Sequence, residues 1–180
     1  MRILALSGSL RARSLNSMLL RAAVSLAPAG VAVDLDNNIS RLPLFNPDLE
    51  ALDPQPVAAL RNQVISSDAV LIASPEYAHG VSGVIKNALD WMVGNESFVG
   101  KPVGLLNASP RATIGQDALR EILLTMSACV VPEACVAVPI LGSGLSEAGI
   151  VGHPTIGPLI TSALSALQHR CVGRARLSSC

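Results

Sequence analysis

Residues 2–17 read RILALSGSLRARSLNS, and the change of pattern inside this stretch decides the fold. Its first part is a short apolar run, which is typical of a strand that is buried on both faces. From Leu15 onward, apolar residues recur at the three- and four-residue spacing of a helix. Small polar residues, beginning with Ser7-Gly8-Ser9, separate the two parts. The stretch therefore predicts one strand–loop–helix unit of an α/β protein.

The same alternation of strand and helix patterns continues along the chain. We expect strands over Arg2–Ser7, Val31–Leu35, Ala69–Ala73, Pro102–Ala108 and Ala128–Val138, the last interrupted at Pro132-Glu133. We expect helices over Leu15–Ala27, Gln55–Ser66, Gly83–Val93, Gln116–Ser127 and Pro154–His169, and a long loop over Asp36–Pro54. This order predicts a flavodoxin-like three-layer α/β sandwich with a five-stranded parallel sheet of order 2-1-3-4-5.

The composition narrows the class of protein. The chain has 180 residues, half of them hydrophobic and only 14% charged, which fits one folded domain over residues 1–180. Its 13 basic and 13 acidic residues balance, so nothing favours nucleic acid as a partner. A net charge of zero also gives little self-repulsion, which favours self-association.

Location and metal binding follow from what the sequence contains. No apolar run reaches the roughly 18 residues of a membrane span, and the first run is too short for a signal peptide, so we expect a cytoplasmic protein. Its cysteines, Cys129, Cys135, Cys171 and Cys180, lack CxxC spacing, so we expect no metal site. Cys129 and Cys135 lie in an apolar stretch, and we expect them to be reduced core residues. The basic tail Arg170–Cys180 is expected to fray.

In a sheet of this order, ligands bind where the strand order reverses, beyond the carboxyl ends of the first and third strands. The loop Gly8–Ser14 lies there and leads into a helix N-terminus, which suits a phosphate. It matches neither GxGxxG nor GxxxxGK[ST]. Its composition alone fits equally a phosphate site or a serine-capped helix with a solvated Arg11.

Two further loops should lie beside the first. In Pro75–Ser82, Tyr77 offers a flat surface, Glu76 is a solvated acid or a residue that orients the loop, and His79 receives no catalytic role. The loop Ser109–Gly115 follows the fourth strand and is either a plain turn before a helix or a further ligand wall.

Two motifs give a specific resemblance. The first is Gly8-Ser9-Leu10-Arg11-x-x-Ser14-x-Asn16, and the second is Pro75-Glu76-Tyr77 continuing to Gly83-x-x-Lys86-Asn87-Ala88-Leu89-Asp90-Trp91. With both in order, residues 1 to about 170 resemble the NAD(P)H-dependent FMN reductase family, which includes quinone, azo-dye and chromate reductases.

The resemblance implies a site for flavin mononucleotide (FMN). It implies that the phosphate is bound by Ser9, Arg11, Ser14, Asn16 and Ser17, that the isoalloxazine ring is lined by Pro75, Glu76 and Tyr77, and that Ser109 contacts the flavin. It further implies a homodimer or homotetramer with flavin sites near subunit boundaries. The chain departs from the family at Ala78, where many members have Asn, and at Pro110-Arg111-Ala112, where a Gly-rich segment is common.

The implied activity is a ping-pong reaction. NADPH or NADH gives a hydride to the flavin, and a small-molecule acceptor then takes the electrons, so no catalytic side chain is required. Arg11 is the candidate for an additional contact with a phosphate of the nicotinamide donor. The alternative is a flavodoxin-type electron carrier, which the balanced charge and the scarcity of aromatic residues disfavour. A receiver domain is disfavoured because Ser7, Gly8 and Ser9 stand where acidic magnesium ligands are needed.

Overall fold

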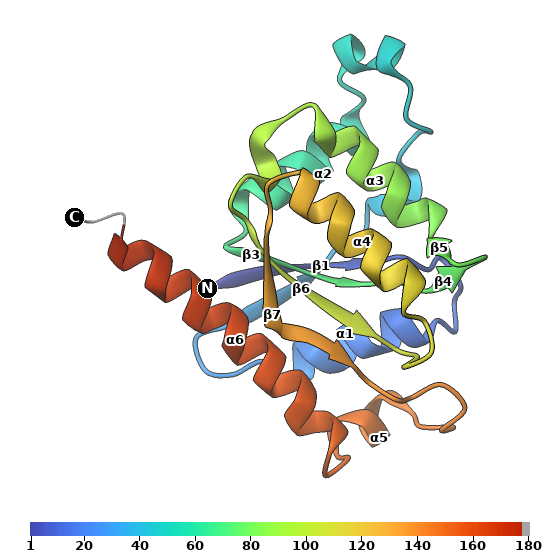
Figure 1. Ribbon diagram of the computed structural model, residues 1–180, viewed down its shortest axis with the longest axis vertical. Helices are drawn as coiled ribbons and strands as arrows, with labels where there is room; N and C mark the ends of the chain where they lie inside the picture. The colour runs from blue at the N-terminus through green and yellow to red at the C-terminus, as the bar shows by residue number, and fades with distance from the viewer. Residues whose placement is uncertain (178–180) are drawn as a thin grey trace.

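Five parallel strands form the central sheet of the computed structural model, which describes residues 1–177 (Figure 1). They are β1 (Arg2–Ser7), β2 (Ala32–Leu35), β3 (Ala69–Ala73), β6 (Pro102–Asn107) and β7 (Cys129–Ala137), in the order β2-β1-β3-β6-β7. The predicted flavodoxin-like order is confirmed, because β4 (Glu76–Tyr77) and β5 (Gly80–Val81) belong to a separate antiparallel hairpin.

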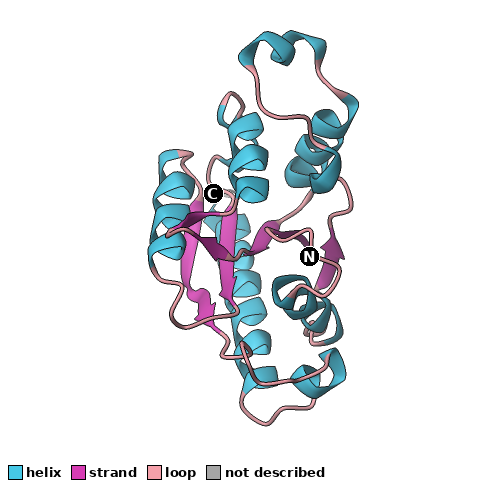
Figure 2. Ribbon diagram, turned by 90° about the vertical axis from the view of Figure 1, so that its right-hand side faces the viewer, coloured by secondary structure: helices cyan, strands magenta, loops and turns pink. Residues whose placement is uncertain are grey.

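Helices cover both faces of the sheet, as the side view shows (Figure 2). One face carries α1 (Leu15–Ser25), α5 (Glu147–Val151) and α6 (Ile156–Leu177), and the other carries α2 (Gln55–Ser66), α3 (Gly83–Val93) and α4 (Ile114–Thr125). In β3, Leu71 packs into the core on one side, and Val70 and Ile72 pack into the core on the other. Burial on both faces explains the continuous apolar runs of the strands.

The interruption predicted at Pro132-Glu133 is present as a bulge in the edge strand β7. Val103 pairs with Val130 and Leu105 pairs with Cys135, so Gly104 alone faces the residues between these pairs. A Cβ atom on Gly104 would lie 3.0 Å from the Cβ of Ala134. A glycine at this position therefore gives the bulge the room it needs.

The C-terminal part of the chain corrects one prediction. Helix α6 runs from Ile156 to Leu177, so it does not end at His169, and the tail does not fray from Arg170 as expected; Ser178–Cys180 lie outside the described residues. No proline lies between His169 and Leu177, and Arg170 still contacts the main body, with its Nε 3.2 Å from the Sγ of Cys129. Helix α5 was not predicted, since five residues are too few for a clear periodic pattern.

The segment between β2 and α2 projects as an arm at the top of Figure 1, with short 3₁₀ helices η1 (Ile39–Arg41) and η2 (Pro47–Leu52). Two residues of α3 fasten its base. Asn87 Nδ2 donates to Pro43 O at 3.0 Å, and Asn87 Oδ1 accepts from Phe45 N at 2.8 Å. Trp91 Nε1 also donates to Pro43 O, at 2.9 Å, and its ring meets that of Phe45 edge to face. Trp91 is therefore a core residue that anchors the arm.

Replacing Asn87 with Ala is expected to destabilise the fold by about 2 kcal/mol, because the Phe45 amide loses its partner and the Pro43 carbonyl keeps only the Trp91 donor. Urea denaturation followed by circular dichroism measures this change. Lys86→Ala, one position earlier on the exposed face, is the matched control and is expected to change stability by less than about 0.5 kcal/mol. Equal losses in the two variants would contradict the anchoring role of Asn87.

Candidate functional site

The loops after β1, β3 and β6 meet at the carboxyl end of the sheet and enclose a pocket of about 360 Å³. It lies where the chain leaves β1 and β3 toward opposite faces, which is the place that the strand order predicts for a ligand. Of the nine predicted site residues, the ones that line it are Ser9, Arg11, Ser14, Asn16, Pro75, Glu76, Tyr77 and Ser109. Ser17 does not line it.

Hydrogen bonds made by serine hydroxyls hold the first loop in shape. Ser14 is the N-cap of α1, and its Oγ accepts from Ser17 N at 3.2 Å. Ser17 Oγ lies 2.8 Å from Ser7 Oγ and donates to Ser9 O at 3.4 Å. Ser17 therefore holds the loop in shape, while Ser9 and Ser14 stay at the pocket.

Asn16, in the first turn of α1, has a buried polar atom without a hydrogen-bond partner among the described residues. Its side chain lies in the pocket wall and is 7% exposed. Its Oδ1 atom is buried and has no hydrogen-bond partner among the described residues. A buried amide oxygen without a partner costs free energy, and exchanging the oxygen and nitrogen of the amide would leave a donor in the same situation.

Gly8 allows the first two loops to touch. Its N–H donates to Ala73 O at 2.8 Å, which extends the pairing of β1 with β3 by one residue. A Cβ atom on Gly8 would lie 2.5 Å from Ser74 Oγ and 2.8 Å from Ser82 Oγ. A larger residue at position 8 would therefore require these side chains to shift.

The second loop is a hairpin, which the sequence analysis did not predict. Ala78 and His79 form its two-residue turn, with φ values of 49° and 58°. Two-residue hairpins favour positive φ at both turn positions, and Asn-Gly is the preferred pair. The asparagine common in the family at position 78 thus suits the backbone of this turn, and Ala78 places a strained residue there.

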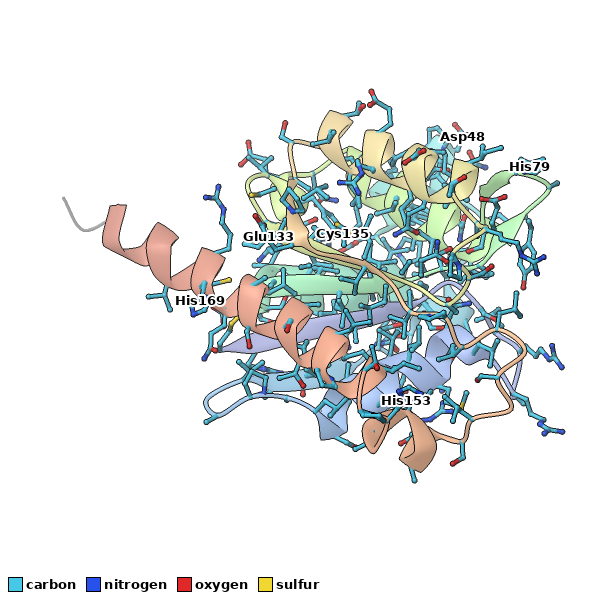
Figure 3. All side chains as sticks on the ribbon, turned by 60° about the horizontal axis from the view of Figure 1, so that its bottom comes forward. Asp48, His79, Glu133, Cys135, His153 and His169 are labelled. Atoms are coloured by element: carbon cyan, nitrogen blue, oxygen red, sulfur yellow. The ribbon has the colours of Figure 1, made fainter. Side chains whose placement is uncertain are left out.

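Glu76 joins the hairpin to the third loop. Its Oε2 accepts from Gly115 N at 2.7 Å, and its Oε1 lies 3.1 Å from Nδ1 of His79, which Figure 3 shows at the hairpin tip. The Gly115 N–H, and then His79, lower the pKa of Glu76. The carboxylate therefore stabilises the fold above its ordinary pKa, and this contribution is lost as the pH falls through the lowered pKa. Of the two interpretations of Glu76, the loop-orienting one agrees with these contacts.

The third loop is shaped by Asn107, which the sequence analysis did not single out. Asn107 is 6% exposed, its Oδ1 accepts from Ser109 N at 2.9 Å, and its Nδ2 donates to Ala112 O at 2.8 Å. Ala112 N donates to Ser109 O at 3.0 Å, which closes a turn around Pro110 and Arg111. The available signal was one polar residue at the end of a wholly buried strand.

The pocket is basic although the chain is neutral. Arg11, Arg13 and Arg111 line it, whereas Glu76 is the one acidic residue of its lining. Several lining residues were not among the predicted site residues, namely Arg13, Leu15, Ser74, Asn107, Ala108, Arg111, Ala112 and Leu141. Leu141 comes from the segment after β7, which no local motif connects to the site. The strand order defines a protein of the flavodoxin-like class, and this charge at a helix N-terminus and a topological switch point suits an anionic ligand.

Comparisons with known proteins agree with this class. The family model described as NADPH-dependent FMN reductase matches residues 1–141. An NAD(P)H-dependent FMN reductase of Pseudomonas aeruginosa is 43% identical over 111 residues, which are 60% of each chain. The quinone reductase of Escherichia coli K12 is 36% identical over 138 residues, covering 72% of this chain and 73% of that one.

A solved structure extends the likeness over nearly the whole chain. FerB, a flavoenzyme NAD(P)H:(acceptor) oxidoreductase from Paracoccus denitrificans, superposes with a TM-score of 0.78 at 28% identity, covering 94% of this chain and 98% of its own. The chain thus belongs to the NADPH-dependent FMN reductase family, as its two motifs indicated. It is an oxidoreductase of the FMN- and NAD(P)H-dependent kind.

A glycine at position 78 tests the left-handed backbone conformation of the hairpin turn. Ala78→Gly is expected to raise the free energy of unfolding by about 1 kcal/mol, because glycine adopts a positive φ without the steric cost of a Cβ atom. Chemical denaturation measures the gain. Ala112→Gly, in the third loop at a residue without a positive φ, is the matched control and is expected to be neutral or destabilising. A loss of stability in Ala78→Gly would contradict the left-handed conformation of Ala78.

Proposed function

We propose that residues 1–180 act as one domain that binds FMN in the pocket and uses NADPH or NADH to reduce a small-molecule acceptor. One observation carries the assignment of the site: Asn16 belongs to the lining of a pocket with three arginines, and its buried Oδ1 has no partner among the described residues. FMN fits this arrangement, because it combines donor hydroxyls on its ribityl chain with an anionic phosphate.

The phosphate end is assigned to the first loop. The N-terminus of α1 provides backbone N–H groups and a partial positive charge. Ser9, Ser14 and Asn16 add short polar groups, and Arg11 adds a guanidinium. Ser17 supports the loop from behind through Ser7 and Ser9 instead of facing the ligand.

The ring end is assigned to the second and third loops. Pro75, Glu76 and Tyr77 form one wall, and Ser109 stands on the neighbouring loop. Tyr77 is 61% exposed and is the one aromatic residue of the pocket lining, so the described residues offer no aromatic sandwich for both ring faces. One open face suits a reductase, since a nicotinamide must reach the flavin, and does not suit a carrier that shields it.

When bound, FMN supplies the redox chemistry by taking a hydride from NAD(P)H and passing electrons to an acceptor such as a quinone, a free flavin or a xenobiotic. The protein holds and orients the reactants. No side chain of the pocket lining is arranged as a general base, because the Glu76 carboxylate is engaged by Gly115 and His79. His79 is 77% exposed at the hairpin tip and keeps no catalytic role.

A homodimer or homotetramer is proposed for the working enzyme. Large apolar side chains are exposed on the arm and on α3, among them Leu44 at 83%, Leu52 at 73% and Val93 at 62%. Burying them against a second copy is favourable. Light scattering is expected to give a mass of two or four chains, and the Leu44→Glu/Leu52→Glu variant is expected to dissociate at lower concentration. A monomeric wild-type protein would contradict the proposal.

No helix among residues 1–177 is long and apolar enough to cross a membrane. The cytoplasm is the location that we propose for the protein.

The direct test is spectroscopic. The purified protein is mixed with FMN, freed of unbound flavin, and treated anaerobically with NADPH and then with NADH. Retained flavin that bleaches with either donor supports the proposal and ranks the donors. Retained flavin that neither donor bleaches would favour the carrier, and the absence of retained flavin would refute the assignment of the pocket.

Asn16→Leu is expected to have opposite effects on the stability of the FMN-free protein and on its affinity for FMN. Removing the buried oxygen is expected to leave the FMN-free protein as stable as the wild type or more stable by about 1 kcal/mol, since an unpaired polar group is removed. The same change is expected to weaken FMN binding about tenfold or more, since one polar contact to the ligand is lost. Thermal unfolding without FMN and fluorescence titration with FMN measure the two effects.

Arg11→Ala is the companion variant and is expected to weaken FMN binding without the gain in stability. Arg41→Ala, an exposed arginine on η1 away from the pocket, is the matched control. Unchanged FMN affinity in both Asn16→Leu and Arg11→Ala would show that the phosphate end lies elsewhere.

A further inference from the structure

Within the part of the chain that the structure describes, some arginine side chains have a hydrogen-bond or ion-pair partner, and others have none. Among side chains of residues 1–173, which the structure describes, most basic groups contact an acid, a carbonyl or a thiol, namely Arg2, Arg21, Arg61, Lys86, Lys101, Arg120 and Arg170. Arg11, Arg13, Arg41 and Arg111 have no such partner within that range. All of these except Arg41 line the pocket.

The three pocket arginines come from two different walls. Arg11 and Arg13 belong to the first loop, beside the N-terminus of α1, while Arg111 belongs to the loop after β6. A single phosphate carries at most about two negative charges near neutral pH. If FMN places its phosphate at the first loop, Arg11 and Arg13 match that charge, and Arg111 is left for a second anion.

Arg111 is held in place by its own loop. The turn from Ser109 to Ala112 is closed by a 3.0 Å hydrogen bond, and Asn107 binds both of its ends. Pro110 occupies the second position of this turn, where its fixed φ is favourable, and Arg111 follows with a negative φ, which agrees with a type I turn. Less conformational entropy is lost on binding when the group is presented by such a rigid turn.

We infer that Arg111 is a specificity-determining residue that binds the anionic group of the second substrate, either the 2′-phosphate of NADPH or an acidic group of the acceptor. This inference rests on the proposed function, because it needs FMN at the first loop. A guanidinium pairs well with phosphate, sulfonate or oxyanion groups, in a way that a Gly-rich loop does not.

Equilibrium binding provides a test that does not depend on turnover. FMN-loaded wild type, Arg111→Ala and Arg111→Lys are titrated with NADP⁺ and NAD⁺ by calorimetry, and the FMN dissociation constant of each is measured by fluorescence. If the anion is the 2′-phosphate, Arg111→Ala is expected to weaken NADP⁺ binding about tenfold relative to NAD⁺. Arg111→Lys is expected to recover part of the loss, and Arg41→Ala to show none.

Steady-state kinetics of the FMN-loaded enzyme test the other source of the anion. The acceptors are 1,4-naphthoquinone and its 2-sulfonate, which differ by one negative charge. If the anion belongs to the acceptor, Arg111→Ala is expected to lower the ratio of kcat/KM for the sulfonate to that for the neutral quinone about tenfold. High salt is expected to reduce this ratio in the wild type more than in the variant.

The outcomes separate the two proposals. A fall in either ratio with unchanged FMN affinity supports the role of Arg111 and identifies the source of the anion. Unchanged ratios for both donor and acceptor overturn it while leaving the proposed function intact. A loss of FMN affinity as large as that of Arg11→Ala also overturns it, since Arg111 then serves the FMN phosphate. A wild-type protein that retains no FMN refutes the proposed function and this inference together.

Discussion

The close contact of Gly8 with Ser74 and Ser82 is the constraint on which the site depends. It keeps the carboxyl ends of β1 and β3 in direct contact, while the segments that follow the two strands lead to helices on opposite faces of the sheet. The loops must then diverge around a common space, and that space is the pocket. The Glu76–Gly115 hydrogen bond closes the same space on its far side, because it joins the hairpin to the start of α4. Together these two contacts position three loops that are distant in sequence.

Much of the fold could be predicted because the spacing of apolar residues along the sequence indicates the strands and helices. The continuous apolar run of β3 and the spaced apolar residues of α2 gave the observed bounds, Ala69–Ala73 and Gln55–Ser66. What was missed depends on contacts between distant residues. The β4–β5 hairpin has strands of two residues each, and Leu141 reaches the pocket from a segment without a motif. The extension of α6 could not be predicted, because the basic, polar stretch after His169 is also typical of a frayed chain end.

In the candidate site, too, the residues of local motifs could be predicted, and those whose role depends on the folded loops could not. The residues of the two motifs lie together at the predicted switch point, since the carboxyl ends of parallel strands meet at one edge. Asn107 escaped notice because its importance lies in hydrogen bonds with Ser109 and Ala112 that only the folded loop reveals. Both departures from the family have a backbone explanation. Ala78 occupies a left-handed turn position, and Pro110-Arg111 builds a proline-led turn in place of flexible glycines.

The buried oxygen of Asn16 has a consequence for the stability of the folded chain. A ligand that satisfies this atom binds the folded chain and not the unfolded one, so it adds to stability by mass action. With flavin at about 100 times its dissociation constant, this gain is about 2.7 kcal/mol. Newly made chains would then unfold and be degraded more often whenever flavin is scarce. The amount of folded enzyme would then follow the supply of its cofactor.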